Sequence, residues 1–314
     1  KRGRFTKLFE RLASDLMQEC SVLAACQILR LSWDEADGIK QRAVARGLAR
    51  KRTQVAQRLG VDEKSAGRGQ NYVTVVARLE PGQSATVEYV GDGRTQEALD
   101  AYWQQVPVEH RAGVEAVAMD LWEPYYNSTV AYVPEAAQKI VHDPYHLGRM
   151  LSDAVDEVRK AEHRVLAHSG DDRLTGSKYL WLYGWENLPA VHQERFDQLR
   201  GQRLKTSRAW ALKEMFRDFW ASETVEAGRE FFRSWYSWAI RSRLEPIKQV
   251  ARSFKAHLEN VLTYFTHRIT NAALEGLNNR IAGLVKKAYG YRNRERFKTD
   301  ILFHLGGLDL YPSQ

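Results

Sequence analysis

The apolar positions of the first fifty residues recur at the three-and-four spacing of helices with one buried face. The pattern predicts helices over residues 4–18, 20–30 and 33–52, with Ser32 placed to cap the third helix. A short break between the second and third helices is typical of a helix-turn-helix. We therefore expect a helical DNA-binding domain over residues 1–56.

From about residue 58 the pattern changes to that of strands. Three segments rich in β-branched and aromatic residues predict an antiparallel meander over residues 59–65, 71–79 and 85–91. Helices and buried strands then alternate over residues 95–106 (helix), 113–120 (strand), 123–133 (helix), 138–143 (strand) and 144–165 (helix). This order is that of a ribonuclease-H-like domain, an α/β fold whose mixed sheet is flanked by helices. We assign its first part to residues 57–164.

Residues 165–268 contain no convincing strand and are rich in Trp and Arg. Because aromatic side chains dominate buried area, we expect most of them to form the core of an all-helical insertion. Contact of some of these Arg and Trp residues with DNA is the alternative. Pro246 predicts a helix break, and residues 269–314 then return to the catalytic domain and end in a basic helix.

The last long helix carries an apolar stripe along residues 274–288, with Glu275 beside it. Gly276 and Gly283 each cost this helix roughly 1 kcal/mol relative to Ala. We therefore expect backbone or DNA to approach closely there, with Glu275 facing a metal ion. The alternative is a surface helix that is capped by Asn271.

The positive charge is concentrated at the two ends of the chain. The 314 residues carry a net charge of +8; residues 1–60 hold 13 Lys and Arg against 6 Asp and Glu, and residues 276–314 hold 7 against 3. This asymmetry suits a polyanionic partner, of which nucleic acid is the commonest, and a solvated basic surface is the alternative that composition leaves open. The predicted DNA-binding residues are Lys40, Arg42, Arg46, Arg50, Lys51, Arg52, Lys286, Lys287, Tyr291, Arg292 and Arg294.

Other features of the composition narrow the class. No apolar run approaches membrane-spanning length, and no charged and apolar leader opens the chain. We expect a cytoplasmic protein that is nucleoid-associated when bound to DNA, with no membrane partner. Cys20 and Cys26 are too few for a four-ligand zinc site and are interpreted as two buried thiols.

Three acids are placed where this fold would bring them together. Asp62 lies on the first strand, Asp120 ends the strand after the meander, and Glu275 lies on the last long helix. Neighbouring carboxylates repel one another unless a cation lies between them, and Mg²⁺ or Mn²⁺ suits an all-oxygen site. Because side chains alternate along a strand, only one of Asp62 and Glu63 is expected to face the site. As an alternative, Asp62 is an ordinary strand-end residue and Asp120 a helix cap.

The sequence resembles the ISL-three group of bacterial insertion-sequence transposases, which have a DDE-type catalytic domain. The resemblance covers essentially the whole chain and is carried by "GVDEKS", "VAMDLWEPYYNSTVAYVPEAAQKIVHDPYHLGRMLSDAVDEVRK" and "TNAALEGLNNRIAGLVKKAYGYRNRERFKTDIL". It implies that Asp62, Asp120 and Glu275 form the catalytic, metal-binding triad, with two Mg²⁺ or Mn²⁺ ions per active site. It further implies cleavage of double-stranded DNA at terminal inverted repeats, followed by strand transfer into target DNA by a homodimer or larger assembly.

Asp143 and His146 resemble a pair that adjoins the active site in this and related transposase groups. They and Asn279 are candidates for active-site support. Asp143 is equally suited to cap the helix that Pro144 begins. Such transposases usually begin with a Cys-rich zinc module, and from the absence of its motif we expect a trimmed chain in which terminal-repeat recognition is incomplete.

Two other functions share this fold. One is a catalytically inactive DNA-binding protein that acts as a repressor or architectural factor. The other is a structure-specific nuclease, which uses the same phosphodiester chemistry without strand transfer. The presence of all three acids favours an enzyme over the inactive protein, and the Trp-rich insertion and basic N-terminal helices favour the transposase over the nuclease.

Overall fold

The computed structural model describes residues 5–313 except residues 52–55, 66, 68–70 and 270–271. Arg52 and Asn271, to which the sequence assigned a DNA contact and a helix cap, therefore lie outside the described residues. The described residues divide into two compact units. The first contains residues up to Ile140 and from residue 271 onward, and the second contains residues 141–270. None of the described helices has both the length and the apolar character needed to cross a membrane.

Three helices begin the first unit: α1 (Lys7–Glu19), α2 (Val22–Leu29) and α3 (Trp33–Arg50). The Ser32 hydroxyl accepts a hydrogen bond from the Glu35 backbone N–H at 3.3 Å, and the Glu35 carboxylate accepts one from the Ser32 N–H at 2.9 Å. This reciprocal capping box starts α3 at the predicted position, because it satisfies two N–H groups that have no partner within the helix.

The central sheet of the chain has the order β3-β2-β1-β4-β5. Its strands are β1 (Arg58–Ser65), β2 (Tyr72–Arg78), β3 (Thr86–Asp92), β4 (Ala116–Met119) and β5 (Ile140–His142). The first three strands pair antiparallel and β4 runs parallel to β1. The observed mixed α/β architecture is consistent with the expected ribonuclease-H-like fold, although β5 is shorter than predicted because α7 (Ala136–Lys139) takes up the start of its segment.

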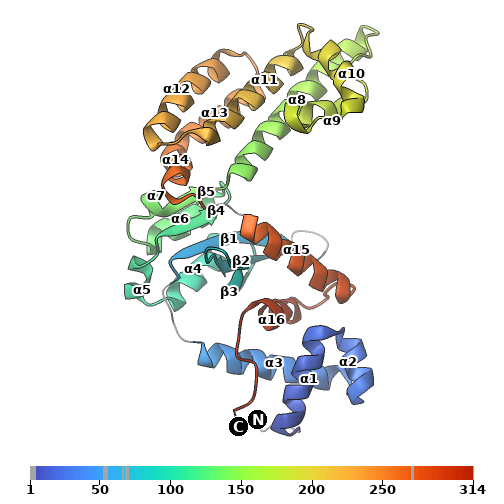
Figure 1. Cartoon of the computed structure of the whole chain (residues 1–314), viewed down its shortest axis with the longest axis vertical. Coiled ribbons are helices and arrows are strands. Elements are labelled where there is room, and N and C mark those ends of the chain that lie inside the picture. Colours follow the sequence, from blue (N-terminus) through green and yellow to red (C-terminus); the bar gives the residue numbers. More distant parts are fainter. Residues whose placement is uncertain (1–4, 52–55, 66, 68–70, 270–271, 314) are drawn as a thin grey trace. The chain divides into compact units, whose positions relative to one another are not determined.

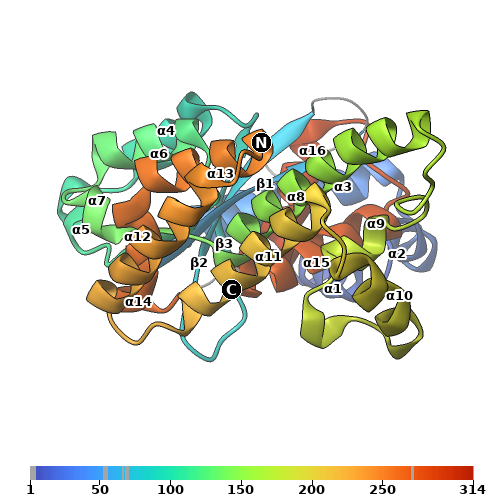
Figure 2. The same cartoon turned by 90° about the horizontal axis from the view of Figure 1, so that it is seen from above.

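The remaining helices of the first unit are α4 (Gln96–Gln105), α5 (Val108–Ala112), α6 (Glu123–Tyr132), α15 (Ala272–Lys287) and α16 (Arg294–Leu305). Leu59 and Val61 belong to the apolar core that the sheet shares with α4 and α6. Gly60, between them, faces Leu274 of α15, and a Cβ at Gly60 would lie only 2.5 Å from that side chain. The alternation of β1 therefore gives the sheet two covered faces, and α4 and α15 lie on opposite sides of it (Figures 1 and 2).

The second unit is helical, and residues 165–268, all of them described, contain no strand, as expected. Its helices are α8 (Pro144–His168), α9 (Lys178–Leu182), α10 (Ala190–Arg200), α11 (Lys205–Arg217), α12 (Val225–Arg241), α13 (Glu245–Ala256) and α14 (Leu258–His267), with short 3₁₀ turns at Trp185–Asn187 and Asp218–Ala221. Trp235 and Phe254 are fully buried and pack with Phe216. Many of the predicted aromatic residues thus form the core of this unit.

Candidate active site

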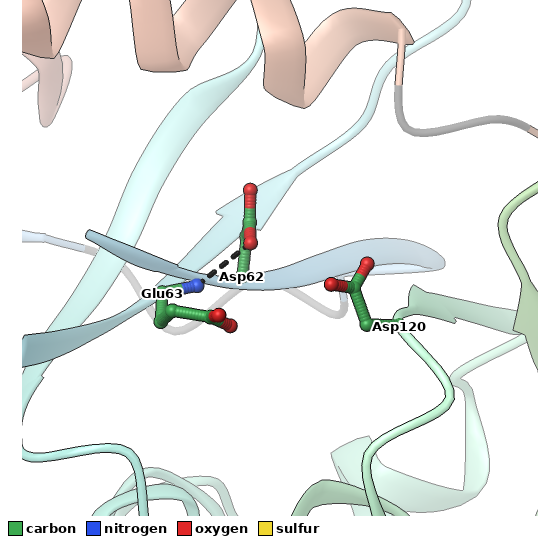
Figure 3. A group of neighbouring side chains, drawn as sticks. All are labelled: Asp62, Glu63 and Asp120. Carbon is green, nitrogen blue, oxygen red and sulfur yellow. Dashed lines mark hydrogen bonds between the residues drawn. The ribbon is translucent and has the colours of Figure 1, made fainter. Parts of the chain in front are cut away.

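Three carboxylates gather where β1 and β4 run side by side. One oxygen from each of Asp62, Glu63 and Asp120 lies within 4.8 Å of the other two (Figure 3). Val61 pairs with Met119 in the parallel register, so the next residues along the two strands, Asp62 and Asp120, are neighbours at the edge of the sheet. An all-oxygen donor set at this spacing fits a hard divalent cation.

Asp62 and Glu63 leave β1 on opposite faces, as strand alternation requires. Figure 3 shows the Asp62 side chain on the side of α15 and the Glu63 side chain on the other side. The expectation that only one of them faces the site was nevertheless wrong. Asp120 comes directly after the last residue of β4 and so lies at the end of that strand. From there one of its carboxylate oxygens lies within 4.8 Å of an oxygen of both Asp62 and Glu63.

Glu63 is held by residues that the sequence analysis missed. The Arg94 guanidinium Nε lies 3.1 Å from Glu63 Oε1, and the guanidinium carbon lies 4.1 Å from the centre of the Trp122 ring. Trp122 also donates its backbone N–H to the carbonyl oxygen of Asp120 at 2.8 Å. Arg94 follows the third strand and Trp122 follows Asp120 by two residues, and neither position carries a local pattern that would have identified it.

Glu275 lies in the first turn of α15 and is exposed. The predicted stripe beside it is buried at Leu274, Leu277 and Ile281. Among the described residues, the cluster of carboxylates within 4.8 Å does not include Glu275. Two contacts anchor the helix next to it: Leu274 packs on Gly60, and Asn278 Nδ2 donates to Asp62 Oδ2 at 2.5 Å.

The asparagine that contacts Asp62 is Asn278, whereas the predicted residue was Asn279. Asn278 follows Leu274 by four residues and therefore lies on the same side of the helix, toward β1. Asn279 is exposed. The four-residue spacing from the buried stripe was the signal that could have distinguished the two.

The glycines of α15 do not serve a close approach of protein backbone. A Cβ built at Gly276 or Gly283 would meet no described protein atom within 4 Å. That part of the expectation was wrong, because the helix is anchored through Leu274 and Asn278 and both glycines face open space. Gly60 of β1 is the glycine that permits close packing.

A buried tyrosine lies near enough to the acidic cluster to be influenced by its charge. The Tyr125 hydroxyl lies 2.9 Å from the hydroxyl of Thr74, and the ring is fully buried. Burial raises the pKa of Tyr125 well above its usual value, and the negative charges of Glu63 and Asp62 add to the effect. Tyr125 therefore stays a neutral hydrogen-bonding group.

Comparison with known proteins identifies the family. A model of the ISL-three group of DDE transposases, described as "Transposase", matches residues 59–301, which contain all three predicted acids. The chain belongs to this transposase family. The match confirms the resemblance that the three sequence passages indicated.

The similarity to two curated relatives extends beyond residues 59–301. The transposase for insertion sequence element IS1001 of Bordetella parapertussis is 26% identical over 301 residues, which are 94% of this chain and 73% of that protein. The transposase for insertion sequence element IS1557 of Mycobacterium tuberculosis is 24% identical over 326 residues, which are 96% of this chain and 72% of that protein. The similarity therefore includes the N-terminal helices as well as the sheet and the insertion.

Asp143 and His146 of the transposase belong to the second unit. Asp143 is buried at the N-cap of α8 and its side chain makes no capping hydrogen bond, although Pro144 begins the helix as expected. His146 Nε2 lies 3.9 Å from Asp143 Oδ2. The two residues form a pair, and their support of the active site stays a prediction.

The basic residues of α3 have internal partners. Lys40 is 2% exposed and forms an ion pair with Asp300 of α16, while Arg42 and Arg46 bind the buried carboxylate of Glu10. Arg50 pairs with Asp309 at 2.9 Å, and Lys51 pairs with Glu88 at 2.8 Å. These contacts disfavour Lys40 in particular as a DNA ligand, since its ammonium is buried.

The turn between α15 and α16 presents its cations differently. Lys286, in the last turn of α15, and Arg292 are exposed, and their side chains make no ion pair or hydrogen bond with the described part of the chain. By contrast, the hydroxyl of Tyr291 donates to Asp300 at 2.6 Å, and Arg294 bonds to Asn71 at 2.6 Å. A groove of about 1240 Å³ opens beside this turn, and its lining includes Trp33, Lys287, Tyr289, Arg292 and Arg296.

Proposed function

We propose that this transposase cleaves DNA at the ends of an insertion sequence and transfers the resulting 3′-hydroxyl into target DNA, with Asp62, Asp120 and Glu275 as its catalytic acids. The observation that carries the proposal is the convergence of Asp62 and Asp120 at the sheet edge, with α15 anchored on Asp62. Glu275 precedes Asn278 by three residues, so it shares the helical surface that reaches the aspartate.

The residues present fit a hard divalent cation, because the cluster offers only carboxylate oxygens. We propose two Mg²⁺ or Mn²⁺ ions per active site. When bound, such ions activate water or a 3′-hydroxyl and stabilise the departing oxygen of a phosphodiester. In this assignment Asp62 and Asp120 would hold the cations together with Glu275 of α15, and Asn278, which donates to Asp62, fixes the orientation of that carboxylate. Asp143 and His146 are kept as candidate supporting residues, and Asn278 takes the place of Asn279.

The DNA path that we propose follows the α15–α16 turn. The exposed Lys286 and Arg292 supply charges for phosphates, and the exposed ring of Tyr289 is placed to stack on a base. These three residues follow Glu275 in the chain, at the end of α15 and in the turn after it. The active form is proposed to be a homodimer or larger assembly, because two element ends must be paired before transfer.

The experiment is a cleavage and strand-transfer assay on labelled element ends with Mg²⁺. Asp62→Asn, Asp120→Asn and Glu275→Gln should each reduce cleavage by at least about a thousandfold, because an isosteric amide cannot supply the anionic ligand. DNA binding measured in Ca²⁺ should stay within about threefold of wild type. Asp309→Asn, which alters an exposed carboxylate outside the matched region, is the control and should retain activity.

The outcomes separate the alternatives. Full cleavage by one of the three variants would remove that residue from the site. Nicking without joined products would favour a structure-specific nuclease. Binding without any nicking in Mg²⁺ or Mn²⁺ would favour a catalytically inactive DNA-binding protein.

A further inference from the structure

We propose that Arg94 is a positioning residue for the metal site. Held on the ring of Trp122, it pairs with Glu63 and offsets the charge of that carboxylate. The pairing lowers the affinity of the acidic cluster for a divalent cation. The proposal rests on the metal site of the proposed function. It assigns a role to three residues outside the predicted triad. Arg94 and Trp122 are together called the Arg94 clamp.

The backbone before Arg94 is fixed by the conformation of Gly93 and by two hydrogen bonds that Gly93 makes. Gly93 has a φ of +86°, a conformation that favours glycine. Its N–H donates to the carbonyl of Tyr72 at 2.9 Å, and its own carbonyl accepts from the Thr74 hydroxyl at 2.8 Å. Arg94 therefore leaves the end of β3 from an anchored position, on the face of the sheet that holds Glu63.

The clamp touches both segments that carry the acids. Arg94 Nε is 3.1 Å from Glu63 Oε1, and the Trp122 ring lies under the guanidinium at 4.1 Å. Because Trp122 also donates its backbone N–H to Asp120, the platform for Arg94 is tied to the end of β4. A guanidinium that is both paired and stacked has few other positions available.

Charge determines what the clamp does. Three carboxylates within 4.8 Å form a cluster that would bind a divalent cation through every member. Glu63 and Arg94 are 17% and 31% exposed in their side chains, so solvent screens their attraction only partly. The pair is close to neutral as a unit, so Glu63 attracts the cation less than its own charge would.

A charge cycle measured by Mn²⁺ calorimetry on the full chain without DNA tests the clamp. Arg94→Met should tighten Mn²⁺ binding by about tenfold, because the positive charge that offsets Glu63 is removed. Glu63→Gln should weaken binding several-fold, because an uncompensated Arg94 remains. The double variant should return to within about threefold of wild type. Loss of folding cannot imitate this pattern, since a structural defect does not increase affinity.

Arg78→Met is the matched control. Arg78 Nε also lies 3.1 Å from a glutamate oxygen, that of Glu88, and Arg78 pairs with Leu59 three residues away from Asp62 along β1. Its removal should leave Mn²⁺ affinity within about twofold of wild type. Circular dichroism melts establish that each variant is folded at the temperature of the titration.

The outcomes distinguish the clamp from the metal site itself. Unchanged or weaker Mn²⁺ binding by folded Arg94→Met would overturn the clamp while leaving the metal site intact. Equal tightening in Arg94→Met and in the double variant would show that Glu63 is not the group restrained, and would also overturn it. Absence of Mn²⁺ binding by the wild type would overturn the metal site and the clamp together.

Discussion

Helix α3 and the α15–α16 turn are both rich in Lys and Arg, but their cations have different partners. In α3, Lys40 is paired with Asp300, and Arg42 and Arg46 share Glu10. At the turn, Lys286 and Arg292 are exposed, and their side chains bond to no described residue. The comparison shows that net charge along the sequence does not measure the charge that is available to a polyanion.

The difference follows from burial of the acids. Glu10 and Asp300 are 5% and 6% exposed, and a buried carboxylate is stable only when it is paired and hydrogen-bonded. Helix α3 packs against both α1 and α16, so its cations are the ones that compensate these acids. We infer that the basic face of α3 serves mainly to hold the N-terminal helices on the sheet domain, whereas the turn serves DNA.

The largest expected effect concerns the buried pair between α3 and α16. Lys40→Met should lower the free energy of unfolding by about 3–5 kcal/mol, because Asp300 then stays buried without its cation. Lys40→Met combined with Asp300→Asn should recover most of this loss, since the amide still accepts the Tyr291 hydrogen bond. Urea denaturation measures both. A loss below about 1 kcal/mol would mean that the pair does not hold the helices together.

A smaller effect is expected from the histidine beside this pair. Burial, with the nearby charges of Lys287 and Lys40, lowers the pKa of His304 to about 4, although Asp300 acts in the opposite direction. Between pH 4 and 6.5 the unfolded chain therefore binds a proton that the folded chain does not, and stability falls as the pH falls through this range. After allowance for solvent screening, this loss of unfolding free energy is at most about 2 kcal/mol. It is absent above pH 6.5 and grows as the pH falls toward 4.

Unfolding of wild type and His304→Gln between pH 4 and 7 measures this contribution. The variant should show the shallower dependence over that interval, since the carboxylates titrate in both proteins. Parallel curves would contradict the burial argument.

The smallest effect on stability is expected in the α15–α16 turn. Lys286→Gln with Arg292→Gln should change the free energy of unfolding by less than about 0.5 kcal/mol, because neither side chain has a partner in the described chain. It should reduce the slope of log affinity against log salt by about 2, corresponding to two lost phosphate contacts. Fluorescence anisotropy on element-end DNA at several salt concentrations measures the slope.

Arg42→Gln with Arg46→Gln is the matched double variant in α3. It should lower the free energy of unfolding by about 1–3 kcal/mol, because Glu10 loses its donors, and it should leave the salt slope unchanged. A reversed result, with the slope altered by the α3 variant and not by the turn variant, would reverse the roles of the two regions.

The local pattern of the sequence determined the type and order of most elements and the place of the acids on them. Strand alternation placed Asp62 on β1, and the run of buried residues that precedes Asp120 placed this acid at the end of β4. Helical spacing identified the buried stripe beside Glu275. These features are determined within a few residues of chain, because backbone geometry imposes periods of 2 and 3.6. They were therefore predictable without knowledge of the packing.

Tertiary packing alone decided which side chains meet. Lys40 and Asp300 are separated by 260 positions in the sequence, and no periodicity relates them. The same holds for Gly60 beneath Leu274 and for Arg94 on Trp122, where the contact depends on how distant segments stack on one sheet. A cation pairs with whichever buried acid the fold brings within reach, so the sequence marked the charged residues while the packing of helices on the sheet assigned their partners.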